Sequence, residues 1–164
     1  LGMAATVRIG FRVGASEVEQ ARVTAGLAIA TTILIALSGS IFIYFFRFDL
    51  VALYTNDVEV ARISSSLLLF VTFFLVLDAI QSTASGALRG FKDTRRPMWI
   101  AIFSFWVVGL PLECALGFGW FGEPMGVYGF WIGLSAGIGT AAVLLLVRLW
   151  KTSHNYERIR QYSR

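Results

Sequence analysis

Four long runs with almost no charged side chains constrain the fold of this chain more than any other feature. They cover residues 23–46, 63–88, 97–122 and 124–147, and the only charges inside them are Asp78 and Glu113. A helix crosses a hydrocarbon core about 30 Å thick with about 20 apolar residues, because each residue adds about 1.5 Å. Only 15% of all residues are charged, against about a quarter in a soluble domain. The sequence therefore predicts an all-α, polytopic membrane helix bundle over residues 1–150, followed by a polar tail at 151–164.

Basic residues alternate with these runs in a way that predicts topology. Residues 8–22, 89–96 and 148–164 hold three, four and five of the 14 Lys and Arg residues. An even number of predicted helices separates these segments, so all three lie on one side of the membrane, and only Arg47 and Arg62 lie opposite. The positive-inside rule places the basic side and the C-terminus in the cytoplasm. The net charge of +4 is thus explained by topology and by contact with membrane lipid, and it does not indicate a nucleic-acid partner.

Asp78 is the most informative single residue, because an ionised carboxylate inside a bilayer costs roughly 2.5–3.5 kcal/mol on insertion scales. On a helix, Gln81, Ser82 and Ser85 fall three, four and seven residues after it and share its face. Phe74, four residues before Asp78, continues this polar stripe with an aromatic ring. The pattern favours an ion or substrate pathway. The alternative is a protonated Asp78 that only makes a hydrogen bond between helices.

Small residues and prolines add expectations about the helices themselves. Gly129, Gly133 and Gly137 recur at four-residue spacing, which favours close approach of a neighbouring helix. Pro111, just after Gly109, is expected to bend the third helix in mid-membrane.

The predicted outer connection, residues 47–62, carries several acids, among them Asp57. We expect a turn there with Asn56 or Asp57 capping the next helix. An acid at a cavity mouth could also attract cations, although a solvated loop charge is the more common case.

No enzyme constellation is present in the sequence. G-x-S-x-G, H-E-x-x-H, Walker and C-x-x-C motifs are all missing, and the chain has one histidine and one cysteine. Asp78 and Glu113 lie on different predicted helices, so nothing indicates a hydrolytic pair. Transport is the function class that remains.

Five segments spread along the chain carry a family resemblance. They are LGMAATVRIGFRVGA, ALYTNDVEV, SGALRGFKDTRRP, FWVVGLP and EPMGVYGFWIG. In this order they resemble the MATE family of multidrug efflux antiporters, and most closely its NorM-like branch. The resemblance implies a twelve-helix transporter with two six-helix lobes, of which this chain would form part of the C-terminal lobe. The N-terminal lobe of the same protein would then be a partner absent from this sequence.

The resemblance also implies a mechanism. Asp78, in LDAIQS, stands where the family has an acid of the cation-coupling site, so Na⁺ or H⁺ would be the coupling ion, with no other cofactor. The branch has tyrosine at the position of Phe74, whose ring offers cation–π contact but no hydroxyl. Gln81, Ser82 and Ser85 would supply oxygen ligands or a water path, and Asp57 would lie in the loop beside the drug cavity.

The function expected from these observations is export of organic cations from a bacterium by alternating access across its inner membrane. Two alternatives stay open. One is a lipid-linked saccharide flippase of the same superfamily, which would be favoured by basic residues in the membrane centre. The other is a non-transporting scaffold subunit, in which Asp78 would face a partner helix and tolerate substitution.

Overall fold

The computed structural model describes residues 1–120 and 122–154, and all the regular secondary structure in these residues is helical. The helices follow one another along the chain as α1 (Gly2–Gly14), α2 (Val18–Ala52), α3 (Val58–Gly90), α4 (Arg95–Ile102), η1 (Phe103–Gly109), α5 (Leu110–Gly117) and α6 (Val127–His154). Four helical stretches are long and apolar enough to cross a membrane: α2, α3, the continuous α4–η1–α5 unit and α6. The predicted all-α membrane bundle is confirmed.

The helix bounds differ from the sequence prediction mainly at the ends. α2 and α3 contain the predicted spans and extend several residues beyond them, because the chain stays helical where it leaves the apolar layer. α6 begins at Val127 and not at Pro124, which lies in the connection after α5. α6 also continues to His154, so the first residues of the predicted tail are helical. Residues 155–164 of that tail lie outside the described residues.

The third membrane span changes helix type in its middle. Residues Phe103–Gly109 form a π-helical segment that leads directly into α5, where Pro111 is in the first turn. Proline has no N–H to donate, and its ring crowds the carbonyl one turn earlier, which a wider helical turn relieves. The helix type therefore changes just before Pro111, to a π-helical segment of a kind often found at functional sites, and the predicted bend stays a prediction.

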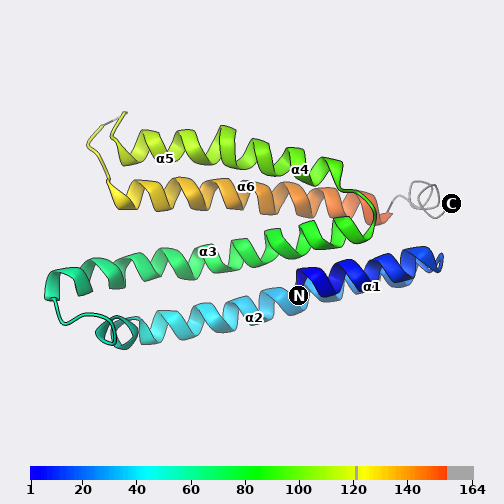
Figure 1. Cartoon of the computed structure of the whole chain (residues 1–164), viewed down its shortest axis with the longest axis horizontal. Helices are drawn as coiled ribbons and strands as arrows, with labels where there is room; N and C mark the ends of the chain where they lie inside the picture. The colour runs from blue at the N-terminus through cyan, green and yellow to red at the C-terminus, as the bar shows by residue number, and fades with distance from the viewer. Residues whose placement is uncertain (121, 155–164) are drawn as a thin grey trace.

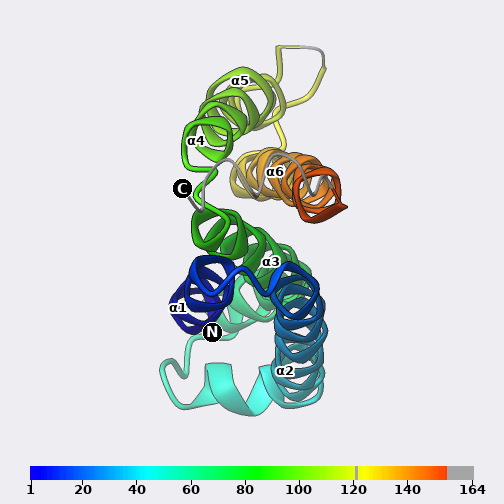
Figure 2. The same ribbon diagram turned by 90° about the vertical axis from the view of Figure 1, so that its right-hand side faces the viewer.

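The helices form a row in which α3 is central. Figure 2, viewed along the helices, shows α4 and α5 at one edge, then α6, then α3, with α1 and α2 side by side at the other edge. α3 accordingly contacts α1, α2 and α6. In Figure 1, where the helices run roughly horizontally, α1 and the C-terminal ends of α3 and α6 lie at the same end of the bundle along the helix axes. This end holds the described basic residues except Arg47 and Arg62, as the charge pattern predicts.

The tightly packed core lies at this same basic end. Ile9 and Val13 of α1, Leu88 at the end of α3 and Phe91 just after it are fully buried, and they belong to one cluster with Leu145 of α6. The neighbouring contact between α1 and α3 is close, because a Cβ on Gly90 would lie 2.8 Å from the Cβ of Ile9. Toward the other end, the apolar side chains of α2 and α3 are mostly exposed or half-buried.

The glycines at four-residue spacing in α6 allow the close approach of a neighbouring helix that their spacing predicts. A Cβ on Gly133 would lie 2.6 Å from the Cα of Glu113, and one on Gly137 would lie 3.0 Å from the Cα of Gly109. Only glycine permits this approach, so α5 and η1 pack directly on α6.

Candidate functional site

Asp78 lies on α3, the helix that touches three others, at position 21 of its 33 residues. Its side chain is half-buried. Within residues 1–120 and 122–154, no hydrogen bond or ion pair reaches its carboxylate, whose oxygen atoms are not fully buried. The alternative in which Asp78 bonds a neighbouring helix has no support in the described part of the chain.

Aromatic contacts define the neighbourhood of Asp78 on the α6 side. The ring of Phe74 meets Trp131 edge to face, with centroids 5.8 Å apart, and Phe70 meets Tyr128 at 6.0 Å. These pairs place one face of α3 against α6 about one and two helical turns before Asp78. Phe74 is thus half-buried against an indole, and Trp131 and Tyr128 are neighbours that sequence reasoning did not assign to the site.

One residue of the predicted polar stripe lies at a helix contact. Gln81 and Ser85 are half-buried. Ser82 is exposed and lies beside α1, where a Cβ on Gly2 would be 3.1 Å from the Ser82 carbonyl oxygen and 3.6 Å from its Oγ. The structure therefore keeps Asp78, Gln81 and Ser85 on a shared sector of α3 and places Ser82 at its border with α1.

Asp57 has a structural task far from Asp78, at the start of α3. Its Oδ1 accepts hydrogen bonds from the backbone N–H groups of Glu59 at 2.9 Å and Val60 at 3.1 Å. The predicted cap is confirmed, because a side-chain oxygen here satisfies N–H groups that lack helical partners. The carboxylate remains exposed, so its attraction for cations stays a prediction.

Glu113, the second acid inside a span, does not join Asp78. It lies on α5 against Gly133 of α6, and α6 lies between α5 and α3 (Figure 2). No group of three or more His, Cys, Asp or Glu side chains comes together among the described residues. A small cation held at Asp78 would therefore take its other oxygen ligands from hydroxyl, amide or carbonyl groups, from water, or from parts of the protein beyond this chain.

An acid that sequence reasoning did not single out is the best-paired one in the described residues. Asp93, in the connection between α3 and α4, accepts from Nε of Arg148 at 2.7 Å and lies 2.5 Å from its Nη2. Thr152 adds a hydroxyl contact at 3.4 Å. The sequence feature that could have indicated this pairing is that Asp93 is a lone acid among four basic residues at 89–96. This ion pair is buried and links the α3–α4 connection to the end of α6.

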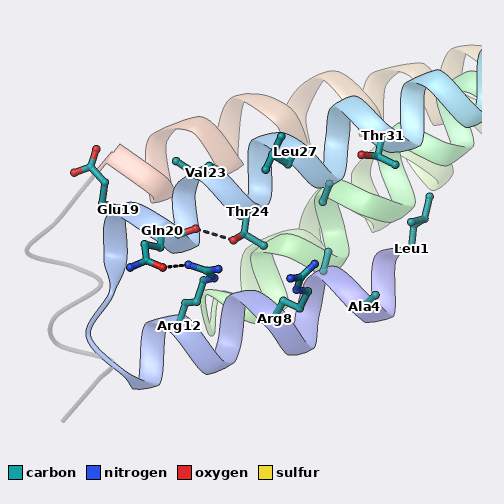
Figure 3. Close-up of a pocket in the computed structure, with 12 residues that line it drawn as sticks. Leu1, Ala4, Arg8, Arg12, Glu19, Gln20, Val23, Thr24, Leu27 and Thr31 are labelled. Atoms are coloured by element: carbon teal, nitrogen blue, oxygen red, sulfur yellow. Dashed lines mark hydrogen bonds between the residues drawn. The ribbon is translucent and has the colours of Figure 1, made fainter.

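A separate groove of about 490 Å³ opens between α1 and α2. Figure 3 shows Arg8 and Arg12 pointing into it, with Leu27 on the opposite wall, and the guanidinium of Arg12 donating to Oε1 of Gln20. None of the predicted site residues lines it. Two guanidinium groups disfavour an organic cation, so this groove is not the drug path that the sequence predicts.

The chemistry that the Asp78 region can support is binding, with a single carboxylate in an apolar, aromatic setting. An unpaired carboxylate attracts a cation strongly where the dielectric constant is low. Aromatic faces add attraction for an organic cation. A reversible cation site inside a membrane is the function that this arrangement favours.

Comparison with known proteins gives consistent results. A model of the MatE family matches residues 1–114. Multidrug resistance protein PmpM of Pseudomonas aeruginosa is 40% identical over 165 residues, which cover 100% of this chain and 34% of that protein. Multidrug resistance protein NorM of Aliivibrio fischeri is 37% identical over 160 residues, covering 97% of this chain and 35% of that protein.

A solved structure has the same fold. The eukaryotic MATE transporter AtDTX14 superposes with a TM-score of 0.88 at 24% identity, covering 99% of this chain and 35% of that one. The chain therefore spans about a third of the length of the relatives that it matches.

Proposed function

Because this chain belongs to the MatE family, we propose that it forms part of the C-terminal lobe of a multidrug exporter. Its similarity to multidrug resistance proteins over nearly its whole length supports an exporter of small molecules and not an enzyme. The observation that carries the proposal beyond the family is Asp78, an intramembrane carboxylate without a partner in the described residues. The complete transporter would include a second lobe, which is a partner of this chain.

The proposed mechanism is competition at Asp78 between an incoming Na⁺ or H⁺ and an outgoing organic cation. Burial disfavours the charged carboxylate and a bound cation favours it, so one group can couple both fluxes. Each elementary charge that crosses the full potential supplies about 2.3 kcal/mol per 100 mV. One or two inward ions per cycle would therefore support a useful drug gradient by alternating access.

Aromatic side chains near Asp78 suit the substrate side of this mechanism. Phe74 and Phe70, about one and two helical turns before Asp78 on α3, pack on Trp131 and Tyr128 of α6. A planar organic cation gains area burial and cation–π attraction from such rings. Gln81 and Ser85 would supply oxygen atoms for the coupling ion or for its water.

The orientation of the chain in the membrane follows from the distribution of its basic residues. Along the helix axes, the end of the bundle that holds α1 and the last turn of α6 carries most of the basic residues. Such an excess of basic residues marks the cytoplasmic side. We therefore place the C-terminus in the cytoplasm of a bacterium, with the four spans in its inner membrane. The basic end would contact anionic lipid.

The two alternatives are less well supported. A saccharide flippase would be favoured by basic residues within the spans, and residues 23–46, 63–88, 97–122 and 124–147 hold no Lys or Arg. A scaffold subunit would need Asp78 to make a helix contact, and no described residue bonds to it.

The decisive experiment is the Asp78→Asn substitution in the full-length protein. We expect efflux of a fluorescent organic cation from cells to fall to the level of cells without the transporter, while membrane expression is unchanged. Asp49→Asn is the matched control, because Asp49 is an exposed acid at the end of α2, and we expect it to retain efflux. Unchanged efflux in D78N would remove Asp78 from the mechanism.

A further inference from the structure

A groove of about 350 Å³ lies between α4 and α6 at the basic end of the bundle. In Figure 1, α4 runs beside the C-terminal half of α6 at this end, and the two helices are in contact. The volume falls within the range of ligand pockets, roughly 300–1,000 Å³. No residue assigned to the Asp78 region lines this groove, so a function for it has to be sought separately.

The wall of the groove that α4 contributes comes from one face of the helix. Arg96, Trp99 and Ile100 line it, and positions three and four residues apart share a helix face. Because α4 begins at the basic end, Arg96 lies nearest that end, and Trp99 and Ile100 lie about one turn deeper. Trp99 is 58% exposed, and tryptophan is enriched where a membrane meets water.

The opposite wall, from α6, has the same order of cation and apolar side chain. Lys151 and Arg148 come from the last two turns of α6, and Val147 and Leu144 precede them. Because α6 ends at the basic end, Val147 and Leu144 lie on its deeper side, and both are exposed. The groove therefore has three cations toward the basic end and apolar side chains farther into the membrane layer.

The positive charge of this groove is only partly neutralised. Asp93 accepts from Nε of Arg148 at 2.7 Å and faces its Nη2, and a guanidinium carries five N–H donors, so further donors of Arg148 remain. Arg96 and Lys151 are exposed. Within residues 1–120 and 122–154, no hydrogen bond or ion pair reaches either side chain. Two uncompensated cations thus face each other across the groove.

Two other grooves near this end have a smaller excess of cations. The groove between α1 and α2 holds two arginines, but Glu19 also lines it and Arg12 donates to Gln20. The groove between α2 and α6 holds one arginine, Arg22, together with His154. The excess of cations over acids therefore distinguishes the groove between α4 and α6 from both.

We propose that the groove between α4 and α6 binds an anionic glycerophospholipid, with its phosphate between Arg96 and Lys151. Charge complementarity and the order of side chains carry this inference, because a lipid has an anionic headgroup above an apolar chain. A free phosphate ion would use the cations alone. The inference requires only that the chain spans a membrane, so it goes beyond drug export and does not depend on Asp78.

Each part of the lipid has a matching part of the groove. The planar guanidinium of Arg96 can donate two parallel hydrogen bonds to phosphate oxygens, and the ammonium group of Lys151 adds a point charge. Trp99 would lie beside the glycerol, and an acyl chain would follow Ile100 and Leu144. Basic pockets between membrane helices are a recurring binding mode for anionic headgroups.

The test measures lipid binding to the full-length protein in detergent. The unfolding temperature is recorded as phosphatidylglycerol is added, because a ligand that binds only the folded state raises it. Phosphatidylcholine with the same acyl chains is the lipid control. We expect a saturable rise with phosphatidylglycerol and no comparable rise with phosphatidylcholine. Equal rises with both lipids would contradict an anionic site.

The variant that probes the groove is Arg96→Gln combined with Lys151→Gln. We expect it to bind phosphatidylglycerol about thirtyfold more weakly, and each single variant about fivefold more weakly. Both side chains are exposed, so the unfolding temperature without lipid should stay near that of the unsubstituted protein. The single variants also serve if the double variant is unstable.

The matched control is Arg8→Gln combined with Arg22→Gln. It removes the same charge from exposed side chains at the same end of the bundle, outside this groove, and should retain the affinity. If both double variants weaken binding equally, net charge alone matters and the groove assignment is wrong.

A soluble probe separates a lipid site from a phosphate site. Glycerol 3-phosphate carries the headgroup charge without acyl chains, and we expect it to leave the unfolding temperature unchanged at the concentrations where phosphatidylglycerol saturates. An equal rise with glycerol 3-phosphate would overturn the lipid assignment. None of these outcomes bears on Asp78, and efflux by D78N does not bear on the groove, so the two proposals fail separately.

Discussion

Asp93 and Asp78 lie near the same contact between α3 and α6 and have opposite surroundings. Asp93, at the basic end, has an arginine at 2.5 Å and a threonine at 3.4 Å, and its side chain is 8% exposed. Asp78, farther along α3, is half-buried without a partner among the described residues. A carboxylate that is fully paired contributes to holding helices together, whereas an unpaired one remains available to a ligand. The comparison shows one acid fixed by an ion pair at the basic end and one acid without a described partner farther along α3.

The packing around the two acids differs in the same direction. Near Asp93, Leu88, Phe91 and Leu145 are fully buried in the main core cluster. Near Asp78, the neighbours on α3 are half-buried or, like Phe73, exposed. Regions with few buried contacts open at lower free energy than cores, a property that the pathway proposed at Asp78 would require.

The largest effect is expected at the paired acid. Arg148→Gln leaves Asp93 buried without its cation and should lower the free energy of unfolding by about 3–5 kcal/mol. Thermal unfolding of the purified full-length protein measures this loss. The double variant Asp93→Asn with Arg148→Gln removes both charges and should lose less than the single variant.

The matched control for the buried pair of Asp93 and Arg148 is an exposed ion pair. Arg12 lies 3.9 Å from Glu17, with both side chains partly in solvent, so Arg12→Gln should change stability by about 0–1 kcal/mol. Equal losses in R148Q and R12Q would show that burial does not distinguish these ion pairs.

A smaller effect is expected at a third aspartate of α3, the cap at its start. Asp57→Ala removes the acceptor for the Glu59 and Val60 N–H groups and should cost about 1 kcal/mol, whereas Asp57→Asn keeps a capping oxygen and should cost little. The two variants therefore separate capping from charge. If D57N lowers drug uptake at low ionic strength without lowering stability, the charge of Asp57 attracts cations.

The smallest effect on stability is expected at the unpaired acid. Asp78→Asn removes no hydrogen bond made within the described chain, so the free energy of unfolding should not fall by more than about 0.5 kcal/mol. The same variant should abolish efflux, as proposed above. A loss of several kcal/mol in D78N would show that Asp78 has a structural partner in the complete protein.

Several parts of the candidate site could be predicted from residues alone. Asp78 could be singled out because a charge in an apolar span is expensive, and Asp57 because aspartate caps helices. Trp131 and Tyr128 could not, because their position next to Phe74 and Phe70 is set only when α6 packs against α3.

The sequence by itself determined the helical class, the four membrane spans and the basic end, because hydrophobic length and charge act locally along the chain. Tertiary structure alone decided which acid is paired, since Arg148 reaches Asp93 across 55 residues of sequence. It also decided that Ser82 of the polar stripe lies beside α1. These outcomes depend on how rigid helices pack side by side, and that packing is a property of the whole row.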